Sequence, residues 1–234
     1  MDNQQQLDKL YHQLYTGDAV QRNNACNGIL KLIEQSTDVD HQDRLRQSII
    51  YPLIDLGRVY HAEMIIEALQ KSANPDMQAA SYFHRIEFCK KILRDSSQVE
   101  AAIREAMAFV EKVGNHAAKA DADMEYGRFL SEQGRGRDAI NFFSDVACYA
   151  ENHHNPKLLA ASKYYSGFCL YRLGHLVMAN SYLREATEIA FRERNQILAQ
   201  TSEVLRAIVL KKLGKDDESS QIFQQWERHF ALII

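Results

Sequence analysis

The sequence predicts an all-α fold, and three observations lead to that prediction. The 234 residues include only 3 Pro and 10 Gly, and residues with high helix propensity, such as Ala, Leu, Glu and Lys, dominate the rest. The second half of the chain repeats itself at a fixed spacing of about 40 residues, which is typical of stacked helical hairpins. No low-complexity segment or flexible linker interrupts the chain. We therefore expect one continuous domain of about five to six hairpins.

The repeat is clearest in three aligned segments, GRFLSEQG at 127–134, GFCLYRLG at 167–174 and AIVLKKLG at 207–214. The same register continues without a gap into the residues that follow. The matching columns are Leu130, Leu170 and Leu210; Gly134, Gly174 and Gly214; Ala139, Ala179 and Ser219; and Phe143, Leu183 and Phe223. A small residue where two helices touch, a glycine whose positive φ ends the first helix, and a large apolar residue on the second helix together predict a hairpin.

These columns resemble those of the tetratricopeptide repeat family, whose helix-turn-helix units stack into a right-handed solenoid. The usual unit of that family is shorter, and the spacing found here resembles the lengthened units of some signalling adaptors and bacterial peptide-sensing regulators. The tryptophan of the family's first helix is absent, because Asp123, Lys163 and Glu203 lie near its place. The resemblance therefore concerns how the hairpins pack.

The amino-terminal residues 1–41 are expected to form a hairpin that caps the array. Two helical stretches, at about 3–15 and 18–36, are separated by the segment Thr16-Gly-Asp, which is typical of a turn followed by a helix N-cap.

Five repeat units follow, and they become more regular toward the carboxyl terminus. Their predicted ranges are 43–77, 78–117, 120–156, 160–196 and 200–234. In the first unit, Pro52 would cost about 3 kcal/mol inside a helix, so we expect the helix to kink or to begin there. In the second unit, the turn at 95–97 lacks the glycine that the other units carry.

Composition excludes several classes of function. A formal net charge of -3 disfavours nucleic-acid binding, which usually relies on a basic excess. The amino terminus carries no basic and apolar leader, and no run of 18 apolar residues occurs, so we expect no membrane partner. The four cysteines are far apart and form no C-x-x-C pair, which is typical of reduced thiols and predicts a cytoplasmic protein.

No sequence motif for catalysis, metal binding or phosphate binding is present. The one histidine cluster, His153-His154, lies beside Pro156 between two predicted hairpins, where a solvated loop is the simpler interpretation. We therefore expect no enzyme activity, no metal and no cofactor.

In the tetratricopeptide repeat family, the first helix of each hairpin lines a concave groove that holds peptides or helices of partner proteins. Carried over to this sequence, the candidate lining is rich in aromatic and basic residues, which often dominate binding energy. It consists of Tyr51, Arg85, Phe88, Arg128, Tyr164, Tyr165, Phe168, Tyr171, Arg172 and Lys211, with His84 and Lys212 beside them. Any single aromatic side chain of this set could instead pack between hairpins. The run from 164 to 171 holds more aromatic residues than one hairpin core needs, so we expect part of it to be exposed.

The sequence thus predicts a non-enzymatic scaffold or adaptor that binds a peptide or helix of a partner protein. The alternative is a signalling or transcription-modulating regulator similar to the bacterial peptide-sensing proteins. Residues 1–41 are too few to supply the DNA-binding helix-turn-helix that such regulators often carry.

The carboxyl-terminal helix is strongly apolar and lacks the polar cap that usually ends a solenoid. Either the terminal segment folds back or a second copy covers it, and we expect a homodimer. The candidate dimer residues are Phe223, Trp226, Phe230 and Ile233.

Overall fold

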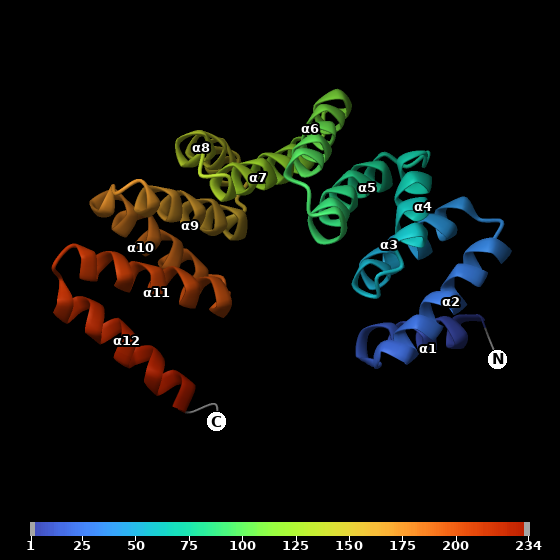
Figure 1. Cartoon of the computed structure of the whole chain (residues 1–234), viewed down its shortest axis with the longest axis horizontal. Helices are drawn as coiled ribbons and strands as arrows, with labels where there is room; N and C mark the ends of the chain where they lie inside the picture. Colours follow the sequence, from blue (N-terminus) through green and yellow to red (C-terminus); the bar gives the residue numbers. More distant parts are fainter. Residues whose placement is uncertain (1–2, 232–234) are drawn as a thin grey trace. The chain divides into compact units, whose positions relative to one another are not determined.

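The computed structural model describes the backbone of residues 3–231 and the side chains of residues 5–226. In that part of the chain, twelve α-helices follow one another as six hairpins (Figure 1). The predicted all-α class is therefore confirmed. The helices are α1 (Asn3–Thr16), α2 (Ala19–Gln35), α3 (Val39–Asp55), α4 (Val59–Gln70), α5 (Pro75–Phe88), α6 (Ser96–Val113), α7 (His116–Glu132), α8 (Gly136–Asn152), α9 (Pro156–Arg172), α10 (Leu176–Arg192), α11 (Gln196–Lys212) and α12 (Asp216–Ala231), with a π-helical turn, η1 (Cys89–Leu93), after α5.

The chain divides into two compact units, Met1–Ala118 and Lys119–Ile234. The first unit contains the hairpins α1/α2, α3/α4 and α5/α6, and the second contains α8 to α12 together with most of α7. No helix in the described residues is both long enough and apolar enough to cross a lipid bilayer.

Polar side chains stabilise the helix ends of the first unit. Asp18 caps α2, because its carboxylate accepts from the backbone N–H of Gln21 while the Gln21 side chain accepts from the backbone N–H of Asp18. This reciprocal pair of bonds is a capping box. The segment around Gly17 therefore separates α1 from α2, as the turn signal in the sequence indicates.

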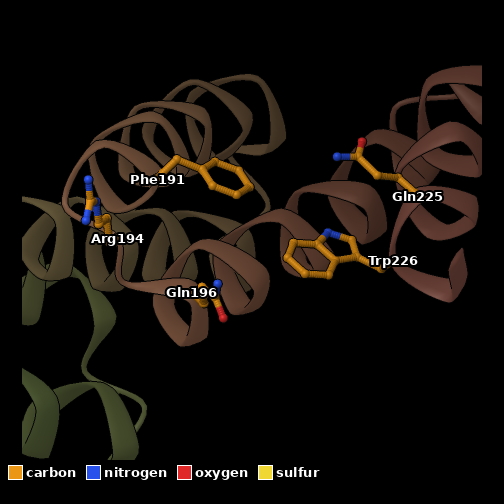
Figure 2. A pocket seen from close by; sticks show the side chains of 5 residues that line it. All are labelled: Phe191, Arg194, Gln196, Gln225 and Trp226. Atoms are coloured by element: carbon orange, nitrogen blue, oxygen red, sulfur yellow. The ribbon is translucent and has the colours of Figure 1, made fainter. Parts of the chain in front are cut away.

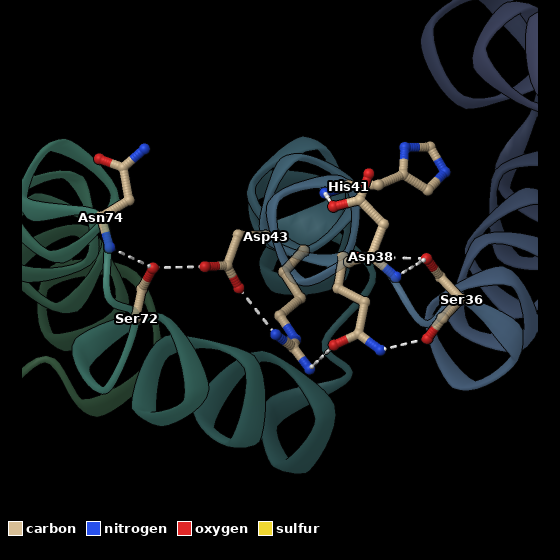
Figure 3. Close-up of polar contacts among 8 residues, drawn as sticks. Ser36, Asp38, His41, Asp43, Ser72 and Asn74 are labelled. Carbon is tan, nitrogen blue, oxygen red and sulfur yellow. Dashed lines mark hydrogen bonds and ion pairs between the residues drawn. The ribbon is translucent and has the colours of Figure 1, made fainter.

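A buried carboxylate connects α3 to the turn that follows α4 (Figure 3). Asp43 is buried in α3, and its Oδ1 lies 2.7 Å from Nη1 of Arg46. Its Oδ2 accepts a hydrogen bond from the hydroxyl of Ser72, and the Ser72 Oγ accepts from the backbone N–H of Asn74. Because each of these buried polar groups has a partner, the network fixes the position at which α5 begins.

Pro52 lies inside α3, in the last turn of that helix. The helix begins at Val39, so the interpretation in which a helix starts at Pro52 is wrong. At this position the missing N–H removes one hydrogen bond near the helix end, while the side chain is buried.

The segment from the cap of α5 to the turn that follows it is one residue longer than the equivalent segment of the second unit. Asn74 caps α5, and Arg94 is the left-handed residue that closes the turn, with a φ of 52°. In the second unit, the cap Asn155 and the turn glycine Gly174 are separated by one residue fewer. The extra residue is accommodated in η1, where the helix widens locally. When α5 is aligned with the other first helices by counting back from the turn, each of its residues is therefore one position out of register.

Close contact between two helices explains the small-residue column of the repeat. A Cβ added to Gly127 would lie 2.6 Å from Cε1 of Phe143, and one added to Gly167 would lie 2.8 Å from Cγ of Leu183. Both Phe143 and Leu183 are fully buried. The prediction that a small residue marks the contact of the two helices is confirmed for these two hairpins.

The third hairpin of the second unit packs differently, because Ala207 occupies the position of the two glycines. Here α12 contacts α11 through Ile222 and Trp226, which pack with Ala207, and the Ser219 hydroxyl donates to the Ala207 carbonyl at 2.8 Å. Phe223, which the sequence aligns with Phe143, is 37% exposed. The sequence match of this column therefore does not extend to its packing.

Two kinds of left-handed residue terminate the helices. Within hairpins of the second unit, the turn glycines have φ values of +77°, +81° and +75° at Gly134, Gly174 and Gly214, which confirms the predicted role of this column. Between hairpins, His154 and Arg194 take the left-handed conformation, although they are not glycine. The residues after them, Asn155 and Asn195, cap the next helix through bonds to backbone N–H groups.

Candidate functional site

The first helices of the hairpins in the second unit present one continuous face of side chains. Positions on this face recur once in every repeat, so Arg128, Phe168 and Ile208 are equivalent on α7, α9 and α11. Between α9 and α11 the face is hollowed into an open depression of about 450 Å³. Its lining residues are Tyr164, Phe168, Gln200, Thr201, Val204, Leu205 and Ile208.

The aromatic residues of α9 divide between this depression and the core. Tyr164 and Phe168 line the depression, and burial raises the pKa of the Tyr164 hydroxyl. Tyr165 packs against Tyr164 with ring centroids 5.1 Å apart and stacks on Phe143 of α8 at 5.5 Å. Tyr171 packs against the core around Leu170. The dense aromatic run therefore serves both purposes that the sequence left open.

Charged side chains flank the depression on the α7 side. The guanidinium of Arg128 lies 2.7 Å from a carboxylate oxygen of Glu125 and 5.5 Å from the centroid of the Tyr165 ring. Desolvation and the nearby charge of Glu125 raise the pKa of Asp121. This end of the face is therefore mixed in charge, and its cation is already neutralised by a carboxylate.

At the carboxyl-terminal ends of α9 and α11, cations lie beyond the apolar lining. Arg172 follows Phe168 by one helical turn, and its guanidinium lies 5.8 Å from the Phe168 ring centroid while donating to the backbone carbonyl of Ser131 at 3.1 Å. Lys212 is the equivalent residue of α11, and its Nζ lies 4.8 Å from the Tyr171 ring centroid. Lys211 is exposed beside it.

Three predicted lining residues belong to the first unit, namely Tyr51, Arg85 and Phe88. Tyr51 lies on α3 and is 42% exposed. Its ring meets that of His84 edge-on at a centroid distance of 5.1 Å. Phe88 is only 1% exposed, so its prediction as a lining residue is wrong. Arg85 is half-buried and forms an ion pair with Glu63 of α4 at 3.0 Å. Its charge is therefore balanced by a residue of the neighbouring helix.

The extra residue in η1 explains the error at Phe88. Counted from the Asn cap, the equivalent of Arg128 in α5 is Glu87, and Phe88 corresponds to the buried Phe129. One residue rotates a helical position by about 100°, which moves a side chain from one face to another.

His84 is the buried polar residue of this region. It is 7% exposed, and neither ring nitrogen has a hydrogen-bond partner in the described residues. Desolvation lowers its pKa to about 4. The ring is therefore neutral near pH 7.

The predicted dimer residues of α12 differ in their accessibility. Trp226 is buried, because its Nε1 donates to Glu203 at 3.0 Å and its ring stacks on Phe191. Its prediction as an exposed dimer contact is wrong, whereas Phe223 is partly exposed. The side chain of Phe230 and all of Ile233 lie outside the described residues.

A second hollow, of about 320 Å³, lies beside the Trp226 ring (Figure 2). Figure 2 shows Phe191 and Trp226 reaching it from α10 and α12, with Arg194 and Gln196 from the turn into α11. It is equivalent to a hollow one repeat earlier that is lined by His154 and Pro156, among others. The recurrence identifies it as a regular feature of the gap between hairpins.

Within the described residues, no group of three or more His, Cys, Asp and Glu side chains is arranged to hold a metal ion. His153 stacks on Tyr149 at a centroid distance of 4.1 Å, and His154 forms the left-handed turn. All four cysteines are free, and Cys148 is the exposed one among them.

Five residues of the depression lie outside the predicted lining, namely Gln200, Thr201, Val204, Leu205 and Ile208. They are neither aromatic nor charged, so their type carries no signal. The signal lies in the spacing, because Val204 and Leu205 occupy the positions of Tyr164 and Tyr165 in the next repeat.

Comparison with known proteins supports the fold. No family model matches the sequence, and no curated protein matches it. Among solved structures, a signal transduction ATPase with a tetratricopeptide repeat sensor from Pyrococcus horikoshii is similar over 94% of this chain, with a TM-score of 0.74 and 13% identity. The chain spans 35% of the length of that protein.

Two Rap proteins are also similar. The apo form of RapI matches over 99% of this chain and 84% of its own, with a TM-score of 0.77 and 10% identity. A Rap protein complexed with competence and sporulation factor matches over 96% of this chain and 65% of its own, with a TM-score of 0.70 and 16% identity. The sequence therefore folds as a TPR-like array of helical hairpins, the fold of the tetratricopeptide repeat proteins.

Proposed function

We propose that this protein is a non-enzymatic scaffold or adaptor that holds a peptide or helix of a partner protein against the first-helix face of its second unit. The observation that carries the proposal is the depression between α9 and α11, whose lining combines two aromatic rings with aliphatic side chains from the next hairpin. Open hollows of this composition suit the apolar side chains of a peptide, which gain free energy when they leave water.

The exposure of the lining side chains supports a role in binding. Ile208 is 38% exposed at the end of the depression, although the neighbouring Val209 and Leu210 are fully buried. The hairpin core is thus complete without Ile208. Tyr164 and Phe168 are half-buried, so each can cover an apolar side chain without moving out of the core.

A matched pair of substitutions tests the proposal. A random dodecapeptide library is displayed against the wild-type protein, and the affinity of enriched peptides is measured by fluorescence anisotropy. Ile208→Gln should lower the affinity of these peptides about tenfold, since it removes roughly 1.5 kcal/mol of apolar contact. Ile197→Gln is the control, because Ile197 is on the same helix, is 79% exposed and lies outside the depression. Equal effects of the two substitutions, or no enrichment at all, would refute the groove.

A regulator is the second candidate, and the similarity to the Rap proteins favours it. One of those structures is described as a complex with competence and sporulation factor. If this chain is a regulator, a peptide that binds the depression should alter the binding of a second protein. If it is an adaptor, the two should bind independently.

We also propose a cytoplasmic homodimer. Support for a reducing compartment comes from the four free cysteines, of which Cys148 is exposed. Support for self-association comes from apolar side chains that the last two hairpins leave exposed, namely Phe191 and Phe223. Sedimentation velocity tests the dimer, since Phe223→Ser should shift it toward the monomer. A monomeric wild-type protein at all concentrations would exclude it.

A further inference from the structure

The cations at the carboxyl-terminal ends of α9 and α11 differ from most other cations of the first helices in the second unit. In the part of the chain that the structure describes, no carboxylate forms an ion pair with Arg172, Lys211 or Lys212. Most other cations of α7, α9 and α11 do have such partners. These pairs are Arg128–Glu125 at 2.7 Å, Lys163–Glu185 at 2.9 Å and Arg206–Glu203 at 3.8 Å. The carboxyl-terminal ends of α9 and α11 therefore carry positive charge without an ion pair.

These cations are positioned next to the depression. Arg172 and Lys212 each lie one helical turn beyond a lining residue, Phe168 and Ile208 respectively, and on the same face. The contact between Arg172 and the ring of Phe168, at 5.8 Å, confirms this placement for α9. The side chains of Arg172, Lys211 and Lys212 are all exposed.

Arg172 and Lys212 are both held toward the preceding first helix. Arg172 donates to a carbonyl of α7, and Lys212 lies over a ring of α9. These contacts reduce the freedom of two long side chains, so less entropy is lost when they bind an anion. They leave other N–H donors of each group available, because a guanidinium has five and an ammonium has three. We call Arg172, Lys211 and Lys212 the basic rim.

We propose that the basic rim selects peptides in which two acidic side chains accompany an apolar residue, an inference that rests on the proposed function. The apolar residue occupies the depression, and the two carboxylates accept charge-assisted hydrogen bonds from α9 and α11. Neighbouring packed helices lie roughly 8–10 Å apart. An extended peptide advances about 3.3 Å per residue. The two acidic residues are therefore spaced about three positions apart.

The same geometry argues against other anions. A single carboxylate at the end of a peptide reaches one helix of the rim and leaves the other unsatisfied. A nucleic-acid strand needs a row of phosphate contacts, whereas the basic rim offers three cations beside an apolar depression. Acidic side chains flanking an apolar one satisfy both parts of the surface together.

The test uses peptides that the wild-type protein selects from the random dodecapeptide library. It compares their affinity for the wild-type protein with their affinity for three charge variants. In Arg172→Gln/Lys212→Gln the rim loses one cation from each helix. In Lys157→Gln/Arg192→Gln the net charge changes equally, but both residues are exposed and lie outside the depression. A third variant, Lys211→Gln/Lys212→Gln, leaves the contacts of Arg172 intact. Urea denaturation establishes that each variant is folded.

Selected peptides should be enriched in pairs of Asp or Glu about three positions apart. Their affinity should fall at least about tenfold in Arg172→Gln/Lys212→Gln, fall in the same direction in Lys211→Gln/Lys212→Gln, and change less than about twofold in the control. Added salt should weaken binding to the wild-type protein more than to the rim variant.

Several results would overturn the inference. Enriched peptides without acidic residues, or an acidic preference that survives in the rim variants, would leave the groove valid and remove the rim from recognition. Tighter binding of a labelled single-stranded oligonucleotide, lost in the same variants, would assign the rim to nucleic acid. Peptides that bind equally well to Ile208→Gln, or no enrichment of any peptide, would overturn the proposed function together with this inference.

Discussion

Gly127→Ala is expected to destabilise the protein, although alanine is the better helix former. The added Cβ would lie 2.6 Å from Cε1 of Phe143 and 3.0 Å from two further ring atoms. The ring is fully buried and stacks on Tyr165 at 5.5 Å, so it has no space into which to withdraw. Overpacking of this kind costs about 1–3 kcal/mol, and the higher helix propensity of alanine returns about 1 kcal/mol. The expected net loss in the free energy of unfolding is up to about 2 kcal/mol.

Urea denaturation followed by far-ultraviolet circular dichroism measures this loss. Gly136→Ala is the matched control, because a Cβ there would lie 3.7 Å from Leu173, an ordinary contact distance. It should leave the free energy of unfolding unchanged or raise it by up to about 1 kcal/mol. In a Phe143→Val background, Gly127→Ala should also be neutral or stabilising, because the ring that it meets is gone. A Gly127→Ala protein as stable as the wild type would show that the helix contact is not close.

Three further predictions concern stability. His84 has a pKa of about 4 in the folded protein and about 6.5 when unfolded, so the unfolded chain binds more protons. The free energy of unfolding should therefore fall by up to about 3 kcal/mol as pH falls from 6.5 through 4. In urea titrations at several pH values, His84→Phe should remove that dependence. Gly174→Ala should lower the free energy of unfolding by about 1 kcal/mol, because the φ of this residue is +81°. Arg94→Gly should raise it by up to about 1 kcal/mol in the same titration, because Arg94 has a φ of 52°. Trp226→Phe should lower the free energy of unfolding by about 1–3 kcal/mol because buried Glu203 loses its donor, and a Trp226→Phe protein as stable as the wild type would contradict the importance of this bond.

The candidate site could be predicted from the sequence only in part. Tyr164 and Phe168 were identified by residue type and both line the depression. Val204 and Leu205 were not, since aliphatic residues on a repeat helix are as common in the core as in a groove. Arg172 was identified by type, yet its lack of a carboxylate partner among the described residues became evident only from the surrounding side chains.

The sequence by itself determined the hairpins, their repeat period and the positions of most turns. These features depend on local physics, because a glycine with positive φ or an Asn cap ends or begins a helix through bonds within a few residues. The tertiary structure decided which faces of those helices are buried. One additional residue in η1 places Phe88 in the core and Glu87 at the position expected for Phe88. A hydrogen bond to Glu203 holds Trp226 buried, where the composition of α12 suggested an exposed contact. Burial of these side chains depends on contacts with residues on other helices, and helical periodicity alone does not reveal which side chain meets which.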